Sequence, residues 1–441
     1  MARDTKTGLR NMVMYSAFMR NHTEEGTFRA FAKDLDRIKR LGVDIIWLMP
    51  IHPVGEAKRK GKDGSPYAIS DYRKTNPDYG TMEDFIFLVD EIHKRDMKCI
   101  IDVVYNHTSP DSLLAKSNPG YFYRKEDGKM GNRIGEWTDV IDLDYSNPEL
   151  WQYQIDTLKM WAEIVDGFRC DVAPMVPIDF WKEAREEVKK IKDDCIWLAE
   201  SSHYSFVKYM RDHHMECSTD NDLYQAFDLC YDYDVYPGFV KYLKGKHGLG
   251  HYIESLIMQE GIYPENYVKL RFLENHDNER LASHVKEEAD RINWIAFSYF
   301  EKGTTLIYEG EEVQAEHRPS IFDKDIIIWE EEKDISDLMK NLYQIKQNAL
   351  RSQGVYSLKA YEEKDIIIGR YKEENDGLLG IFRVKGNCPE VSIEAEDGIY
   401  KNLFDNREVQ VTNGIIKTEK CPIIFQAKLR KENDTEPFET A

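Results

Sequence analysis

Short apolar runs alternate along the chain with longer amphipathic segments. The short runs are rich in β-branched and aromatic residues, which is typical of buried strands. They predict strands at Met12–Phe18, Asp44–Met49, Lys98–Tyr105, Asp166–Asp171, Ile196–Glu200, Ala226–Tyr231, Val268–Glu274 and Thr304–Tyr308. In the longer segments apolar residues recur three or four positions apart, which predicts helices that bury one face. The clearest helices are expected at Phe28–Leu41, Met82–Arg95, Pro148–Ile164, Pro177–Lys192 and Asn293–Phe300.

The alternation of eight strands with helices over about 300 residues predicts an α/β fold. Periodicity leaves two architectures open, a closed parallel barrel and an open doubly wound sheet. The sequence lacks the glycine-rich fingerprint of a dinucleotide-binding sheet, which would support the open form. Two connections are unusually long, at residues 50–80 and about 107–147. Because loops after barrel strands form the rim of the active site, these two should shape the substrate cleft.

From about Leu350 the long amphipathic segments give way to short strands. Strands expected at Asp365–Tyr371, Leu378–Arg383 and Ile423–Ala427 predict a separate all-β domain. We therefore expect a catalytic domain over residues 1–349, with a reduced second domain in its loop at about 107–147, and a β-sandwich domain over residues 350–430. The polar residues 431–441 are expected to be a frayed tail.

Charge and composition narrow the possible partners. The chain carries 60 Lys and Arg against 80 Asp and Glu, a net charge of −20, which would repel nucleic acid and anionic membranes. A neutral substrate fits this charge, and so does a requirement for solubility alone. The first residues lack an apolar run long enough for a signal peptide, so we expect a cytoplasmic protein. The seven cysteines have no metal-ligand spacing and are expected to be reduced core thiols.

Candidate chemistry lies where four of the predicted strands end. These ends read DVVYNHT, GFRCD, IWLAES and LRFLENHD, so each hydrophobic run finishes in charged or polar residues. In a parallel barrel the carboxyl ends of the strands form the active face, and all four groups would meet there. A single Asp or Glu at such a position is more often part of a structural salt bridge. Four together favour a catalytic site.

The segments DVVYNH, GFRCD, AES and FLENHD resemble, in order and spacing, the four conserved segments of the α-amylase family of glycoside hydrolases. The similarity extends over nearly the whole chain, to about residue 430. It implies a (β/α)8 TIM barrel with a C-terminal all-β sandwich domain, an α-glucan oligosaccharide substrate, and members active on maltodextrins. It also favours the closed barrel over the open sheet.

The resemblance implies a catalytic triad of Asp171, Glu200 and Asp277. Retaining glycosidases need one carboxylate as nucleophile and one protonated carboxyl as acid, and the family pattern gives these roles to Asp171 and Glu200. Asp277 is implied to bind hydroxyls of the reacting sugar and to support its distortion. The charges of Asp171 and Asp277 should raise the pKa of Glu200, which must hold a proton near neutral pH.

Four further residues are implied to bind the substrate or to orient the triad. Arg169 precedes Asp171 by two positions, so both side chains point to the same side of the strand and the guanidinium should aim the carboxylate. His107 and His276 resemble the two family histidines that hydrogen-bond the reacting glucose. Tyr67 resembles the tyrosine that stacks beneath it. Asp71, at the family's usual distance from Tyr67, is expected to be structural.

The sequence assigns no metal ligands and no required cofactor, and it leaves a structural calcium ion open. Asn106 resembles an asparagine that ligates calcium in many amylases, but only Asp139, Asp142 and Asp144 could supply acidic partners. The Lys-His pair that often follows the family's nucleophile is replaced by Pro174 and Met175. This departure removes one usual calcium contact and one contact to the leaving sugar.

The leading hypothesis is a retaining hydrolase of α-1,4-glucosidic bonds in maltooligosaccharides or starch fragments. An α-glucosyl transferase or phosphorylase of the same family would keep the same triad, so the sequence leaves these alternatives open. The preference for α-1,4 over α-1,6 bonds is also open, because Val172 after the nucleophile suits both. A non-catalytic scaffold is disfavoured, since Asp171, Glu200, Asp277 and Arg169 are all present.

Overall fold

The computed structural model describes residues 4–135 and 137–430, so the predicted tail at 431–441 lies outside the described residues. The chain forms two compact units, each built from three segments. The first unit comprises Met1–Pro237, Ile262–Ser283 and Gly303–Lys340, and the second comprises Gly238–Gly261, His284–Lys302 and Asn341–Ala441. Because the segments interleave, the single boundary expected near residue 350 stays a prediction. No helix in the described part of the chain is long and apolar enough to cross a membrane.

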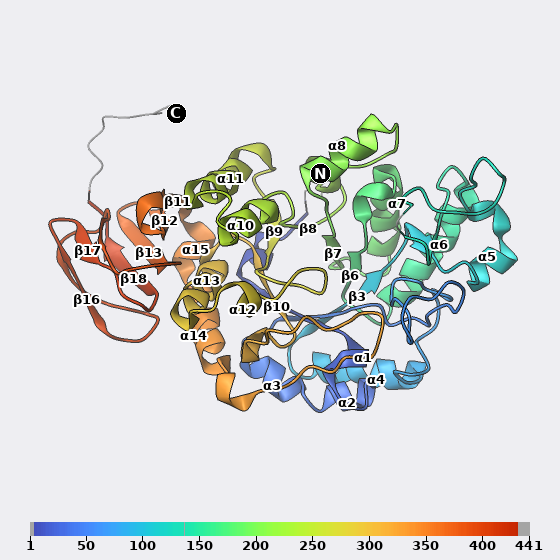
Figure 1. Ribbon diagram of the computed structural model, residues 1–441, viewed down its shortest axis with the longest axis horizontal. Coiled ribbons are helices and arrows are strands. Elements are labelled where there is room, and N and C mark those ends of the chain that lie inside the picture. Colours follow the sequence, from blue (N-terminus) through green and yellow to red (C-terminus); the bar gives the residue numbers. More distant parts are fainter. Residues whose placement is uncertain (1–3, 136, 431–441) are drawn as a thin grey trace. The chain divides into compact units, whose positions relative to one another are not determined.

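The first unit contains a closed barrel of eight parallel strands, which confirms the predicted TIM barrel (Figure 1). Around the barrel the order is β1-β10-β9-β8-β7-β6-β3-β2. Every residue of these strands except Lys98 is buried, in agreement with the apolar runs of the sequence. The strands are β1 Val13–Ala17, β2 Ile45–Leu48, β3 Lys98–Val103, β6 Gly167–Cys170, β7 Ile196–Ala199, β8 Leu229–Tyr231, β9 Val268–Arg271 and β10 Thr304–Tyr308.

Helices follow most of the barrel strands, as the amphipathic segments predict. The segment expected to form one helix at Phe28–Leu41 instead forms two, because the chain turns at Lys33 and Asp34 and the Asp34 carboxylate binds His22 and Arg37. Helices within the first unit are α1 Met19–His22, α2 Phe28–Ala32, α3 Leu35–Arg40, α4 Met82–His93, α5 Leu113–Ser117, α6 Pro148–Ala162, α7 Ile178–Lys189, α8 Tyr204–Asp212 and α9 Asp220–Leu223. The boundaries of the two units fall inside α10 Tyr236–Leu243, α11 Leu249–Ile262, α12 Leu281–His284 and α14 Ser336–Lys346.

The long connection at residues 107–147 has a small sheet of its own. Strand β4 (His107–Thr108) pairs antiparallel with β5 (Ile141–Asp142), so the two ends of the connection are joined directly above the third barrel strand. This pairing fixes the backbone of His107, one of the predicted site residues.

The second unit contains two antiparallel four-stranded sheets, which confirms the predicted all-β sandwich. Apolar side chains of both sheets share one core, including Ile366 and Leu379 from the first and Val411 and Ile416 from the second. The sheets are β11 Val355–Tyr361, β12 Ile366–Glu373, β13 Asp376–Arg383 and β18 Ile423–Lys428, and β14 Glu390–Ser392, β17 Ile415–Lys417, β16 Glu408–Thr412 and β15 Gly398–Lys401. This unit also contains α13 Glu288–Phe300, α15 Ala349–Gln353 and all of α11 except Ile262.

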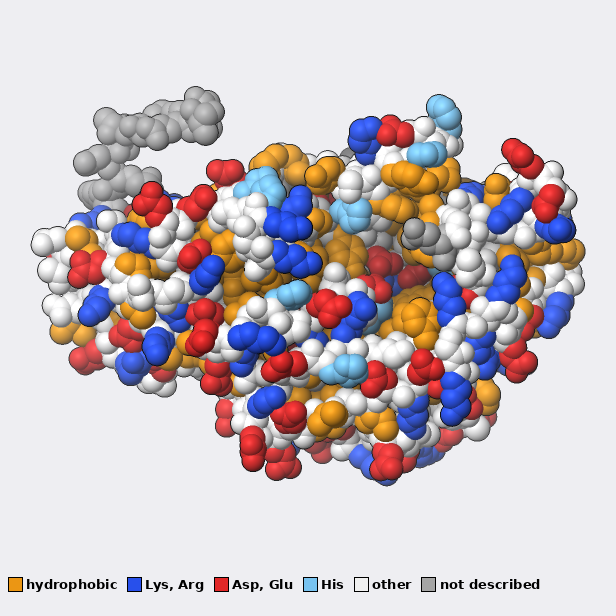
Figure 2. All heavy atoms as spheres, viewed as in Figure 1, with side chains coloured by type: hydrophobic (Ala, Val, Ile, Leu, Met, Phe, Trp, Pro, Cys, Tyr) orange, Lys and Arg blue, Asp and Glu red, His pale blue; other side chains and the backbone are white. Residues whose placement is uncertain are grey.

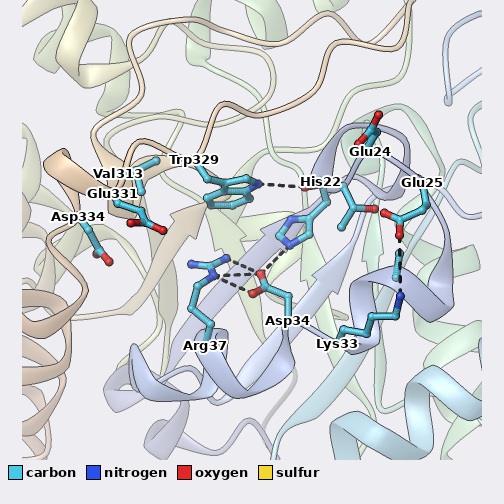
Figure 3. A pocket seen from close by; sticks show the side chains of 12 residues that line it. His22, Glu24, Glu25, Lys33, Asp34, Arg37, Val313, Trp329, Glu331 and Asp334 are labelled. Carbon is cyan, nitrogen blue, oxygen red and sulfur yellow. Dashed lines mark hydrogen bonds and ion pairs between the residues drawn. The ribbon is translucent and has the colours of Figure 1, made fainter.

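A cavity of about 720 Å³ in the first unit has a buried ion network in its wall (Figure 3). His22 lies between two carboxylates, with Nδ1 2.8 Å from Glu309 Oε2 and Nε2 2.9 Å from Asp34 Oδ2. Arg37 binds Asp34 from the other side, and the Trp329 indole donates to the His22 carbonyl. Burial alone lowers the pKa of His22, but the hydrogen bonds to Asp34 and Glu309 outweigh it and raise the pKa to about 8.

We expect His22 to make the stability of the protein depend on pH. A histidine whose folded pKa is about 8 and whose unfolded pKa is about 6.5 stabilises the fold fully below pH 6.5, and this contribution disappears as pH rises through 8. The difference corresponds to about 2 kcal/mol. His22→Gln should therefore lower the free energy of unfolding much more at pH 6 than at pH 9, measured by urea denaturation. The exposed His213→Gln is the control, and an equal loss at both pH values would contradict the protonated-histidine interpretation.

Candidate active site

The four strand ends singled out in the sequence meet at the carboxyl face of the barrel. β3 and β6 are neighbours in register, which places Asp102 beside Arg169, and β7 follows β6 with Glu200 at its end. His276 and Asp277 follow β9. Figure 2 shows acidic side chains at the bottom of a hollow in the surface of the molecule.

Arg169 is the centre of the site and is completely buried. Its Nη1 donates to Asp102 Oδ1 at 2.9 Å and to Asp171 Oδ1 at 2.8 Å, while Nη2 lies 3.1 Å from Glu200 Oε2. Its Nε donates to the Tyr231 hydroxyl. One guanidinium therefore fixes the positions of three carboxyl groups, and the predicted aiming of Asp171 by Arg169 matches this geometry.

Asp171 presents one bound and one free oxygen. Oδ1 accepts the hydrogen bond from Arg169, whereas Oδ2 is buried and accepts no hydrogen bond from any residue in the described ranges. His107 Nε2 is 3.9 Å from Oδ2, beyond hydrogen-bonding distance. A buried carboxylate oxygen without a donor retains its full nucleophilicity, because no hydrogen bond must be broken before it reacts.

Glu200 is held through a single oxygen. Oε2 accepts a hydrogen bond of 2.8 Å from the Val172 backbone N–H and faces Arg169. Val172 has φ of 41°, a left-handed conformation that is rare for a β-branched residue and turns its N–H towards Glu200. Burial, together with the charges of Asp171 and Asp277, raises the pKa of Glu200 well above its usual range and outweighs Arg169. The raised pKa favours the protonated form of this carboxyl, and since Oε2 accepts the Val172 N–H, Oε1 is the oxygen that can carry the proton.

Asp277 is the most exposed of the three triad carboxyl groups. Its side chain is 42% exposed, whereas those of Asp171 and Glu200 are 7% and 14% exposed. Its backbone is fixed by Arg318, which donates to the Asp277 carbonyl at 2.8 Å. A carboxylate that is this accessible on a fixed backbone can accept hydrogen bonds from sugar hydroxyls.

The predicted substrate-binding residues surround these carboxyl groups. Tyr67 Oη lies 2.7 Å from His276 Nε2, the two rings are stacked with centroids 5.7 Å apart, and the Tyr67 ring also lies under Arg169. His276 contacts Asp277 at 3.2 Å, and burial lowers the pKa of its ring so that the neutral form is favoured. His107 packs against Trp137. All seven predicted site residues therefore lie in one connected group.

Comparisons with known proteins agree with this geometry. Residues 13–128 and 135–357 match the family described as alpha amylase, catalytic domain, and residues 357–425 match the bacterial alpha amylase C-terminal domain. The chain belongs to the α-amylase family. It is an α-amylase-type glycoside hydrolase that acts on α-glucans.

Similar solved structures cover almost the whole α-amylase-type chain. An alpha-amylase from Lactobacillus plantarum is 44% identical, with a TM-score of 0.93 over 96% of this chain and 100% of that one. A noncanonic maltogenic alpha-amylase from Thermotoga neapolitana is 34% identical, with a TM-score of 0.85 over 96% of this chain and 100% of that one. Among curated proteins, alpha-amylase 3 of Dictyoglomus thermophilum is 25% identical over 93% of this chain and 86% of its own length. The intracellular maltogenic amylase of Bacillus subtilis is 24% identical, and the chain spans 62% of its length.

Asp102 lies in the DVVYNHT segment that was expected at the active face but was given no role, and Tyr231 and Trp47 were not found by sequence reasoning. Asp102 is completely buried, and burial raises its pKa to about 7 although Arg169 pulls it down. Tyr231 orients Arg169, and Trp47 packs against His276. Asp102 had a signal, because it stands in the same DVVYNH segment as His107. No feature of the sequence indicated the roles of Tyr231 and Trp47, since aromatic residues in barrel strands usually fill the core.

The residues considered for calcium are engaged with protein groups. Asn106 Nδ2 lies 3.1 Å from His107 Nδ1, and Asp139 pairs with Lys60 Nζ at 2.8 Å. Asp142 Oδ2 accepts from the Arg133 backbone, and Asp144 from that of Ser146. Within residues 4–135 and 137–430, no group of three or more His, Cys, Asp or Glu side chains is arranged to hold a metal ion. Pro174 and Met175, which replace the family's Lys-His pair, form a short 3-10 helix with Ala173.

Proposed function

We propose that the chain cleaves α-1,4-glucosidic bonds in maltooligosaccharides or starch fragments with retention of configuration. The observation that carries this proposal is the arrangement around Arg169: Asp171 Oδ2 is buried and accepts no hydrogen bond within the described residues, and Glu200, whose pKa burial raises well above its usual range, faces the same guanidinium. Retaining glycosidases need this combination of a bare carboxylate and a neutral carboxyl on either side of the scissile bond.

In the first step Asp171 Oδ2 attacks the anomeric carbon while the bond to the leaving oxygen breaks. Glu200 Oε1 gives its proton to that oxygen, which departs as the hydroxyl of the leaving sugar. The products are a glycosyl ester on Asp171 and an ionised Glu200. Arg169, which faces both carboxyl groups, stabilises the charge as it moves from Asp171 to Glu200.

In the second step water attacks the glycosyl ester from the side that the leaving sugar vacated. Glu200 removes a proton from the water as it attacks, and Asp171 departs as a carboxylate. Both groups then have their starting charges, and the two inversions together give retention. Asp277 and the two histidines, His107 and His276, are assigned to the hydroxyls of the reacting glucose, and the Tyr67 ring to its apolar face.

A time course of the products from maltoheptaose tests this proposal. We expect only shorter maltooligosaccharides, unchanged by added phosphate or glucose, with the α-anomer formed first in the proton NMR spectrum. Longer oligosaccharides in the presence of glucose, or glucose 1-phosphate in the presence of phosphate, would show a transferase or phosphorylase instead. An initial β-anomer would contradict the Asp171 ester, because one displacement inverts the carbon.

A further inference from the structure

Two loops at the rim of the barrel are fastened to each other. The loop after β2 and the loop after β10 meet at residues 61–64 and 320–324, which we call the loop clasp (Figure 1). The backbone N–H groups of Asp63 and Gly64 both donate to the Phe322 carbonyl, at 3.1 and 2.9 Å. Lys62 N donates to Asp323 Oδ1 at 2.7 Å, and Lys324 N donates to Asp63 Oδ2 at 2.8 Å. Each loop thus supplies both donors and acceptors to the other.

The clasp also has a buried anchor and a glycine that permits close approach. Arg20, from helix α1 after β1, is 8% exposed, and its Nη1 donates to the carbonyls of both loops, Gly64 at 2.9 Å and Ile321 at 3.0 Å. Gly61 has φ of +66°, and a Cβ there would lie 2.7 Å from the Phe322 carbonyl oxygen. The contact between the two loops therefore depends on residues from three segments that are far apart in the chain.

The clasp lies across the barrel from the general acid. β1 has β10 and β2 as its two neighbours, and in the ring of eight strands it is four places from β7, which carries Glu200. The loops after β2 and β10 therefore bridge the side of the barrel opposite Glu200. Since Glu200 must reach the leaving oxygen, the leaving sugars lie on its own side, and the part of the chain retained by the enzyme extends towards the clasp.

Both arms of the clasp are tied directly to the site. Tyr67 follows the first arm by three residues and contacts His276, and Arg318 precedes the second arm by two residues and binds the Asp277 carbonyl. The same loop after β2 is also connected to the 107–147 loop, through hydrogen bonds from Glu56 N and Ala57 N, which precede the first arm, to Asp111 Oδ2. These hydrogen bonds link three rim loops to one another and two of them to residues of the site.

We propose that the loop clasp closes the non-reducing side of the site, so that the enzyme removes short units from chain ends instead of cutting inside the chain. This rests on the proposed hydrolysis of α-1,4-glucan oligosaccharides. The substrate is then an α-glucan oligosaccharide with a free non-reducing end. Internal cleavage would require the retained chain to pass through the wall that Arg20 and the two loops form.

The test compares 4-nitrophenyl α-maltoheptaoside with the same compound whose non-reducing glucose carries a 4,6-O-ethylidene group, with products separated by chromatography. We expect the free substrate to be cut and the blocked one to be cut at least 100-fold more slowly. Equal cleavage of both would overturn the inference and leave the proposed hydrolysis intact. Cleavage of neither would instead overturn the proposed function, so the two failures are distinguishable.

Variants of the clasp residues test whether these loops cause the slow cleavage of the blocked substrate. Asp63→Ala combined with Asp323→Ala removes the two side-chain acceptors of the clasp, and neither residue belongs to the catalytic group. We expect cleavage of the blocked substrate to rise at least tenfold, while kcat/KM for the free substrate changes less than threefold. Arg20→Ala, with its unfolding midpoint measured, is a second variant that removes the anchor, and Asp127→Ala on the 107–147 loop is the control. If neither clasp variant admits the blocked substrate better than the control, the clasp is not what closes the site.

Discussion

Replacing Asp171 with Asn is expected to lower kcat for maltoheptaose on the order of 10⁴-fold or more, because an amide cannot form the glycosyl ester. The loss should appear in kcat and kcat/KM alike, since the interaction exists only during the reaction. The fold should not suffer: Asn can still accept the hydrogen bond from Arg169, and the change removes the charge of one of three carboxyl groups that share this single buried cation. We therefore expect an unfolding midpoint equal to or above that of the unmodified chain.

A rescue experiment separates loss of the nucleophile from a general loss of activity. In Asp171→Gly, azide can enter the vacated space and attack the anomeric carbon of a maltosyl fluoride, displacing fluoride to give the β-maltosyl azide. Asp179→Asn, which alters an exposed carboxylate on α7, is the matched control and should behave like the unmodified chain. Retained turnover in Asp171→Asn, or an α-azide from Asp171→Gly, would refute the assignment of Asp171 as nucleophile.

The fold could be predicted because its strands are buried on both sides and therefore appear as continuous apolar runs. Each expected barrel strand is present, with ends that differ by a few residues, as at Ala226–Tyr231 against the observed Leu229–Tyr231. Closure of the barrel could not come from periodicity, since a strand in an open sheet is equally apolar; it came from the family resemblance. The break between α2 and α3 was missed because it depends on a tertiary contact, in which Asp34 binds His22.

The candidate site could be predicted as a set of residue types at strand ends, but its internal connections could not. The sequence pairs Arg169 with Asp171 because they are two residues apart on one strand. It does not indicate that the same guanidinium reaches Glu200 on the next strand, or that Asp102 competes for it. The Val172 N–H donor depends on a positive φ, which valine rarely adopts, so no propensity rule would have suggested it.

These connections explain why two similar carboxyl groups can have different roles. Arg169 contributes one positive charge to three buried carboxyl groups, so not all of them can be ionised at low cost. Asp171 takes a direct hydrogen bond from Nη1, whereas Glu200 only faces Nη2 and is also exposed to the charges of Asp171 and Asp277. The proton therefore stays on Glu200, which is the group that must donate it.

Replacing Glu200 with Gln is expected to lower kcat/KM for maltoheptaose by about 10²- to 10⁴-fold, because the leaving sugar then departs without a proton. The loss should nearly vanish with α-maltosyl fluoride, since fluoride needs no proton to leave. The dependence of kcat/KM on pH tests the role of Glu200 as the acid independently. In the unmodified chain kcat/KM for maltoheptaose should fall as pH rises through the raised pKa of Glu200, where the acid loses its proton.

In Glu200→Gln the fluoride reaction should show no such alkaline fall, and azide should now give the α-maltosyl azide, because it attacks the intact Asp171 ester. The opposite azide anomers expected from the two variants make the assignments distinguishable from each other. The exposed Glu183→Gln on α7 is the control. An alkaline fall that persists unchanged in Glu200→Gln would show that another group supplies the proton, and Asp102, with its pKa raised to about 7, would then be the next candidate.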